Sequence, residues 1–186
     1  MTDRQDISIG IDFGTTNTVV AVAGPDGDVK ALTFRHANET LKIFQSALCF
    51  WEERSGAALH LQSAGGPWAI EKFLEASLPH RFLQSFKTFA ASKAFQETRI
   101  FRQRFAFEDI LAAFLHSLME HAGEQFPKAR KSVVIGRPVR FAGAAPDESL
   151  AMHAENLEVV AGVTGDLKGA TVVKRGCRHP ESTSFD

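Results

Sequence analysis

Residues 9–18 read IGIDFGTTNT and contain the residue types of this chain that are best suited to chemistry. A glycine followed by small hydroxyl residues lets backbone N–H groups surround an anion, and the hydroxyls add further donors. The carboxylate of Asp12 precedes this turn. It could hold a hydrated Mg²⁺, because Mg²⁺ keeps most of its waters and needs few protein ligands. The alternative is an ordinary hairpin turn that happens to contain threonines.

The residues around this turn predict strands that would position it. Isoleucines and a phenylalanine alternate with small or polar residues over 7–13, which is the period of two expected of a strand. The run TVVAVA follows the turn, and Pro25-Asp26-Gly27-Asp28 is a strong hairpin signal before VKALTF. SALCFWEE is a further candidate strand. The first fifty residues therefore predict an antiparallel meander.

The middle of the chain is rich in phenylalanine and favours helices. Pro67 suits the first turn of one helix, and a longer one is predicted from about Phe107 to Phe126, where apolar residues recur at helical spacing. KSVVIGRPV then predicts a buried strand that Pro138 would stop. Beyond about Leu150 the pattern weakens into short valine pairs and glycines.

Composition and charge exclude several classes of protein. The 186 residues are 44% hydrophobic and 23% charged, which is ordinary for a globular domain. A net charge of -1 gives no electrostatic reason to expect nucleic acid or anionic lipid as a partner. With two cysteines, no signal peptide pattern and no run of about 18 apolar residues, we expect a cytoplasmic protein that does not span a membrane.

The segment IGIDFGTTNT, at residues 9–18, resembles the first phosphate motif of the superfamily that contains actin, sugar kinases and heat-shock ATPases. With Thr-Thr-Asn after the glycine, it is most similar to the DnaK-type chaperones. Four later segments resemble that family in the same order: QSALCF, GPWAIEKFLEA, LQSFKTF and VVIGRPVRF. In the first of them Gln45 stands where a proline is usual. The amino-acid sequences of these segments are similar to those of the YegD-like branch. The resemblance covers roughly residues 7–150.

The resemblance implies a role for each matching residue. Asp12 would hold a hydrated Mg²⁺, and Lys87 would reach the γ-phosphate of ATP and help to place the attacking water. Lys93 is a nearby competitor for that role, and a solvated surface lysine is the alternative. The turn would wrap the β- and γ-phosphates through Gly14, Thr15, Thr16 and Asn17. Phosphoryl transfer asks a protein mainly for positioning and charge neutralisation, which these residue types can supply.

The resemblance also implies parts that are missing from this chain. The family's second phosphate loop, its adenosine pocket and a glutamate before that loop are not recognisable. GDLKGAT, at 165–171, is a faint imitation of the loop that chance explains better than descent. We therefore expect an N-terminal fragment that binds nucleotide weakly and hydrolyses little. Because the resemblance stops near Leu150, the tail at 151–186 is hypothesised to be truncated or frame-shifted sequence.

The expected fold class is α/β: the first lobe of a ribonuclease-H-like, actin-like ATPase fold with a helical peripheral subdomain. The core would comprise about 7–51 and 107–150, and the insertion about 52–106, within an N-terminal lobe of 1–150. The leading function is an ATP-binding and ATP-hydrolysing chaperone-like protein using ATP or ADP with Mg²⁺. In the intact relative, unfolded client proteins are further partners. A sugar or metabolite kinase is one alternative, and a non-catalytic remnant or interaction module is another.

Other constellations have simpler explanations. His116 and His121 are five residues apart on the long predicted helix, about 140° around its axis, so they predict surface histidines rather than a metal pair. Arginines interleave with phenylalanines over 99–105, which favours a subdomain surface with aromatic packing. Trp51 and Trp68 are expected in core or edge packing.

Overall fold

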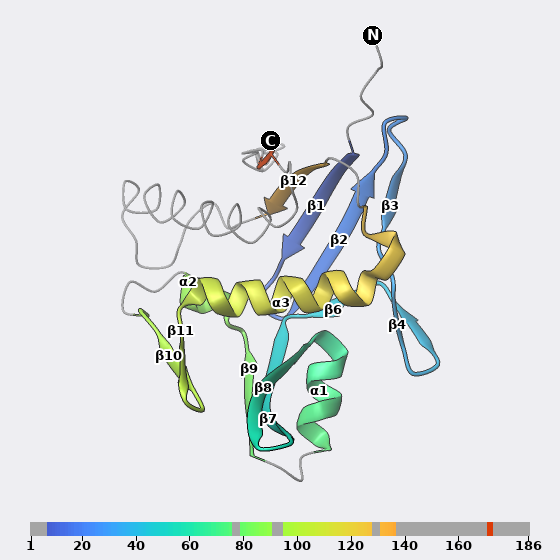
Figure 1. The fold of residues 1–186 in the computed structure, drawn as a ribbon. Helices are drawn as coiled ribbons and strands as arrows, with labels where there is room; N and C mark the ends of the chain where they lie inside the picture. Colours follow the sequence, from blue (N-terminus) through green and yellow to red (C-terminus); the bar gives the residue numbers. More distant parts are fainter. Residues whose placement is uncertain (1–6, 76–78, 91–94, 128–130, 137–170, 173–186) are drawn as a thin grey trace, which may run out of the picture.

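The structure, a computed structural model, describes residues 7–75, 79–90, 95–127, 131–136 and 171–172 (Figure 1). The predicted ends of the insertion can be compared with these elements. The strand that begins at Ala47 runs past residue 51 to Ser55, and the long helix begins at Phe107 as expected. Lys93, Pro138 and most of the tail lie outside the described residues, so the proposed tail boundary stays a prediction.

A central sheet contains the segment IGIDFGTTNT, residues 9–18, in its first two strands and the turn between them. Its strand order is β13-β12-β1-β2-β3, and β6 also pairs with β2. The first three strands run antiparallel, as the meander predicts, and β12 lies parallel to β1. The strands are β1 (Ile7–Phe13), β2 (Asn17–Ala23), β3 (Val29–Ala31), β6 (Phe44–Gln45), β12 (Lys131–Gly136) and β13 (Thr171–Val172).

The predicted hairpin between β2 and β3 is confirmed. The amide of Gly24 donates to the carbonyl of Asp28 at 2.9 Å. Gly27 has a φ of 83°, which a residue with a side chain rarely adopts. The turn residues in the sequence therefore form the turn that they predict, and this turn fixes the register of the two strands.

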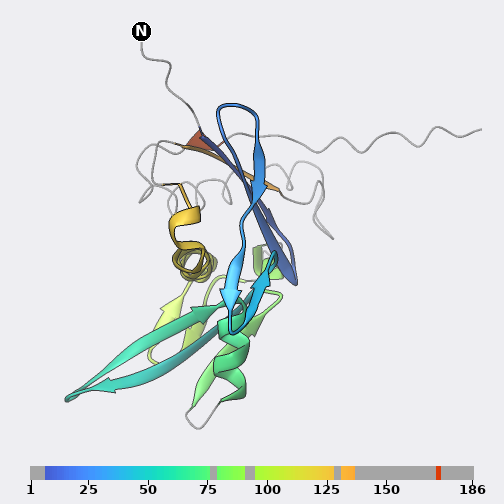
Figure 2. The same cartoon turned by 90° about the vertical axis from the view of Figure 1, so that its right-hand side faces the viewer.

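One long helix, α3 (Phe107–Ala122), covers one face of the central sheet and is followed by the 3-10 turn η1 (Gly123–Gln125). Figure 2 shows this helix nearly end-on beside the sheet. The carboxylate of Asp109 accepts a hydrogen bond from the amide of Ala106 at 2.9 Å, which satisfies a backbone donor at the start of the helix. The apolar stripe that predicted the helix is its buried face: Phe107, Ile110, Leu111, Phe114, Leu115 and Leu118.

Four phenylalanine rings join this helix to the sheet. Phe114 is fully buried, and its ring centroid lies 5.6 Å from that of Phe13, 5.4 Å from Phe44 and 5.3 Å from Phe86. Tilted and edge-on arrangements at these separations are favourable for aromatic pairs. The cluster thus ties together the end of β1, the strand β6 and the segment that leads to Lys87.

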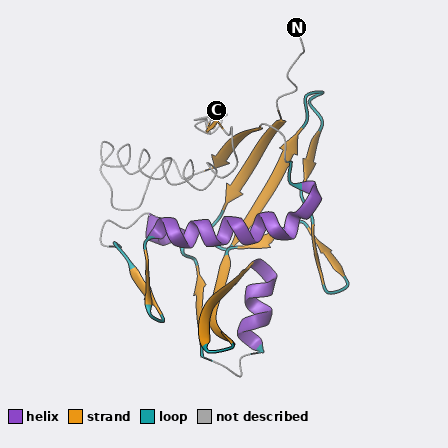
Figure 3. Ribbon diagram, viewed as in Figure 1, coloured by secondary structure: helices purple, strands orange, loops and turns teal. Residues whose placement is uncertain are grey.

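The insertion contains more strand than helix among its described residues, so the prediction of a helical subdomain is met only in part (Figure 3). A three-stranded sheet has the order β8-β7-β9, and α1 begins at Gly66 with a proline in its first turn, as Pro67 predicts. Helix propensity was overridden because these strands pair with one another over long stretches. The elements are β7 (Ala47–Ser55), β8 (Ala58–Gly65), α1 (Gly66–Leu74), β9 (His80–Gln84), α2 (Lys87–Ala90), β10 (Thr98–Ile100) and β11 (Gln103–Phe105).

The insertion is fastened to the core where β8 turns into α1. The amide of Gly65 donates to the hydroxyl of Ser117 on α3 at 2.8 Å. Gly66 has a φ of 64°, and a Cβ there would lie 2.7 Å from the Phe44 ring. Only glycine permits this close approach, which brings the insertion against the aromatic cluster.

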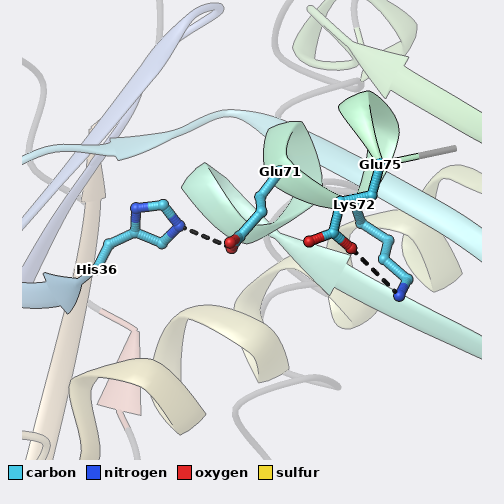
Figure 4. A network of polar contacts seen from close by, with 4 residues as sticks. All are labelled: His36, Glu71, Lys72 and Glu75. Carbon is cyan, nitrogen blue, oxygen red and sulfur yellow. Dashed lines mark hydrogen bonds and ion pairs between the residues drawn. The ribbon is translucent and has the colours of Figure 1, made fainter.

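A second contact joins α1 to the rest of the fold through His36. The small hairpin of β4 (Phe34–His36) and β5 (Glu39–Leu41) places His36 Nε2 3.0 Å from Glu71 Oε2 on α1 (Figure 4). Lys72 of α1 pairs at 3.7 Å with Glu75, the residue that follows the helix. The edge of the His36 ring also meets Trp68 at 5.0 Å between centroids. Trp68 packs against the core, as expected.

The interpretation of His121 as a surface histidine is met only in part, because the residue is half-buried. Its ring stacks on Trp68 with centroids 3.4 Å apart and an interplanar angle of 3°. Burial lowers the pKa of His121, and the nearby His36 lowers it further, while Glu120 opposes the shift. His116, on the same helix, is exposed, as the helical spacing predicted. Within the described part of the chain, no helix is long and apolar enough to cross a membrane.

Truncating Phe114 to alanine should remove the centre of the aromatic cluster. A Phe→Ala change in a packed core costs about 3–5 kcal/mol of unfolding free energy. Urea denaturation measures this loss. The matched control is His116→Ala on the exposed side of α3, which should change stability by less than about 0.5 kcal/mol. Equal losses for the two variants would contradict the assigned packing.

Acid should weaken the fold through His121. Because burial holds the folded-state pKa below the ordinary value, the unfolded chain binds the proton more readily, so stability falls as pH drops below about 6.5. His121→Phe keeps a ring on Trp68 and removes the titration. Urea unfolding from about pH 7.5 to 5.5 should therefore show a shallower loss in the variant than in the unaltered chain. Parallel profiles would contradict this role.

Candidate functional site

The turn between β1 and β2 is closed tightly by its own backbone. The amide of Gly14 donates to the carbonyl of Asn17 at 3.0 Å. A Cβ on residue 14 would lie 2.4 Å from that carbonyl oxygen, which no real side chain can tolerate. Glycine is therefore required here because of a close backbone approach.

The backbone donors at the tip of this turn are available to a ligand. Thr15 and Thr16 are exposed. In the described part of the chain, the amides of these two residues donate to no acceptor. Successive unpaired N–H groups in a turn form a concavity suited to an anion.

Asp12 lies next to this turn on the face of the sheet that is turned away from α3. Its neighbours Ile11 and Phe13 are only 5% and 7% exposed, whereas Asp12 is exposed. Its partner on β2 is Val19, which is 37% exposed. The alternation inferred from the sequence is confirmed, and it presents one carboxylate to solvent beside the turn.

Lys87 is brought to the same place from within the insertion, at the start of α2. Phe86 is fully buried in the aromatic cluster, and its ring lies 5.6 Å from that of Phe13. The next residue, Lys87, donates from Nζ to the carbonyl of Phe13, and its ammonium lies 5.6 Å from the centre of that ring. The role expected of this lysine came from the resemblance alone. The structure places its charge at the end of β1.

The electrostatics of Lys87 reflect this position. Burial lowers the pKa of its ammonium, and the Asp12 carboxylate acts in the opposite direction. The ammonium is therefore partly desolvated and lies within the field of the carboxylate. A partly desolvated cation interacts more strongly with an incoming anion than a solvated one does.

Ser46 is a site residue that the sequence analysis did not identify. It is 2% exposed and lies directly after β6. Its amide donates to the carbonyl of Thr16 at 2.7 Å, and its hydroxyl donates to the carbonyl of Gly14 at 2.8 Å. The signal in the sequence was weak, since a lone serine in QSALCF gives no indication of a partner thirty residues earlier.

Gln45 lies opposite Asn17 in the β2–β6 pair, so the two side chains leave the same face of the sheet. The carboxamide oxygen of Gln45 is buried and accepts no hydrogen bond from the residues that the structure describes. A buried acceptor without a donor is costly. A donor from a bound molecule would remove that cost.

The residues present fit a magnesium-bound phosphate chain. No group of three or more histidine, cysteine or acidic side chains in the described ranges could hold a metal by itself. A hydrated Mg²⁺ needs no such group, because it retains waters and shares its remaining positions with phosphate oxygens. Asp12 is the carboxylate that would bind those waters, and the amides of the turn at Gly14 would receive the phosphate oxygens.

Comparisons with known proteins leave the family open. No family model matches the chain, and no curated protein matches it. One similar solved structure is a non-polymerising mutant of MamK bound to AMPPNP. It is 18% identical, with a TM-score of 0.46, and the match covers 91% of this chain and 41% of that one. The chain thus spans less than half of that structure, and similarity at this level establishes neither a family nor an activity.

Replacing Gly14 with alanine should distort the turn, because the new Cβ would lie 2.4 Å from the carbonyl of Asn17. We expect a loss of about 1–3 kcal/mol in unfolding free energy from this strain. Gly24→Ala is the matched control, since a Cβ there meets its nearest atom only at 4.0 Å. Urea unfolding of both variants decides the matter, and an unaffected Gly14→Ala protein would contradict the geometry.

Proposed function

We propose that this chain binds the terminal phosphates of a nucleotide, together with Mg²⁺, at the turn between β1 and β2. The observation that supports this most strongly is the meeting of two predicted residues. Lys87 contacts the carbonyl of Phe13 at the point where the turn begins, and Asp12 precedes that residue in β1. Lys87 is half-buried, and its charge lies beside a turn whose tip amides donate to no described acceptor, an arrangement that suits an anion.

Each residue then has a defined part in binding. The amides of the turn donate to phosphate oxygens, and the hydroxyls of Thr15 and Thr16 can add donors. Lys87 neutralises charge on the outermost phosphate, and Asp12 binds waters of the metal. Bound Mg²⁺ would neutralise further phosphate charge. These groups supply positioning and electrostatics, which are what phosphoryl transfer requires from a protein.

The finer proposal is an ATP-binding and ATP-hydrolysing, chaperone-like protein of the DnaK type. It is supported by the order of the resembling segments, from IGIDFGTTNT to VVIGRPVRF. Since one phosphate turn supplies only part of the donors that a two-lobed site would offer, weak binding and slow hydrolysis are expected of this chain alone. Client proteins belong to the same finer proposal.

The proposal predicts a charge-specific loss of affinity. Lys87→Ala should weaken binding of Mg·ATP by about tenfold or more, because a hydrogen bond to a charged group is lost. Isothermal titration calorimetry measures this change. Lys42→Ala is the matched control, because Lys42 is exposed, and its replacement should leave the dissociation constant unchanged.

The same titrations separate the alternatives. Unaltered protein that binds neither Mg·ATP nor Mg·ADP would refute the proposal and favour the non-catalytic remnant. A burst of ADP that depends on an added sugar would instead favour the metabolite kinase. Equal losses for Lys87→Ala and Lys42→Ala would remove Lys87 from the site.

A further inference from the structure

The contacts of Ser46 suggest more than ordinary core packing. Within the part of the chain that the structure describes, its side chain and main chain make three hydrogen bonds to the turn or to the residue after it. The amide bonds to the Thr16 carbonyl at 2.7 Å, and the hydroxyl bonds to the Gly14 carbonyl at 2.8 Å. The hydroxyls of Ser46 and Thr18 lie 3.0 Å apart. Thus one buried serine contacts both carbonyls that flank the tip.

The direction of these hydrogen bonds follows from the number of protons. A serine hydroxyl has one proton to donate. Since the Ser46 proton goes to the Gly14 carbonyl, which can only accept, the Thr18 hydroxyl must donate to Ser46. Thr18 is fully buried, so water does not compete for this proton. A relay from Thr18 through Ser46 to the carbonyl strengthens each of its members.

These contacts orient the amides of the turn. In a trans peptide group, the C=O and the following N–H lie in one plane and point in opposite directions. The Gly14 carbonyl points at Ser46, so the amide of Thr15 points away from it. The Thr16 carbonyl also points at Ser46, so the amide of Asn17 points away in the same manner.

We propose that Ser46 is a positioning residue that fixes two peptide planes of the turn, so that the amides of Thr15 and Asn17 face a bound phosphate. The proposal rests on the proposed function, because it assigns the turn a phosphate ligand. Ser46 touches no ligand in this role and acts through the backbone of the turn. A purely structural serine would contribute to stability and leave phosphate affinity unchanged.

Ser117 provides the matched control. It is 7% exposed, and its hydroxyl makes one hydrogen bond to backbone, from the amide of Gly65 at 2.8 Å, away from the turn. Ser46→Ala and Ser117→Ala therefore each remove a buried serine hydroxyl bonded to the main chain. Both should lower the thermal midpoint, but only Ser46→Ala should change the turn.

Calorimetry with magnesium tripolyphosphate tests phosphate affinity without an adenosine contribution. We expect Ser46→Ala to weaken binding by about tenfold, the size set by one buried hydrogen bond and the loss of amide alignment, and Ser117→Ala to leave it unchanged. Unchanged affinity in Ser46→Ala, or equal losses in both variants, would overturn the proposal. Should Ser46→Ala fail to fold, Thr18→Val removes the donor to Ser46 and should weaken binding by about threefold.

Amide hydrogen exchange without ligand separates this proposal from the proposed function. The Gly14 amide is bonded to the Asn17 carbonyl, and it should exchange about tenfold faster in Ser46→Ala than in either the unaltered chain or Ser117→Ala. If the unaltered protein fails to bind tripolyphosphate, the proposed function is lost, and the exchange rate still decides whether Ser46 fixes the turn. Unchanged exchange at Gly14 would overturn the positioning role.

Discussion

The contact between the Gly14 amide and the Asn17 carbonyl, at 3.0 Å, is the constraint on which the site depends. It leaves no room for a side chain on residue 14, and it fixes where β1 ends and β2 begins. Once the chain turns there, the carbonyls of Gly14 and Thr16 accept hydrogen bonds from Ser46, so the amides of Thr15 and Asn17 point away from that residue. The carbonyl of Phe13, just before the turn, is the acceptor that holds Lys87 in place.

The hydrophobic core positions the same residues that the site requires. Phe13 and Phe86 each precede a site residue in the sequence, and both rings pack on Phe114 of α3. Burial of these rings therefore brings Gly14 and Lys87 together from segments more than seventy residues apart. Stability and site geometry share one cause, which explains how the fold holds a lysine against a strand end.

Local patterns in the sequence predicted the elements that depend on local physics. The alternation of 7–13, the hairpin at Gly27 and the helical stripe beginning at Phe107 were all recovered, because period and turn chemistry act over a few residues. The place of Lys87 came only from a resemblance. SALCFWEE was expected as a strand and is β7, whereas β8, β9, β10 and β11 were missed, since their pairing is a tertiary effect that phenylalanine-rich windows do not reveal.

Ser46 and His121 make contacts that the local sequence around each residue does not predict. A serine that bonds to two carbonyls thirty residues earlier has no signature in its own neighbourhood. Helical spacing alone could not show that α1 covers the His121 side of α3 with Trp68.

The central claim remains that the turn holds phosphate. An amide-resolved NMR titration with Mg·AMPPNP tests this most directly: the account predicts that the largest shifts occur at Thr15 to Asn17, and shifts confined to other segments would contradict it.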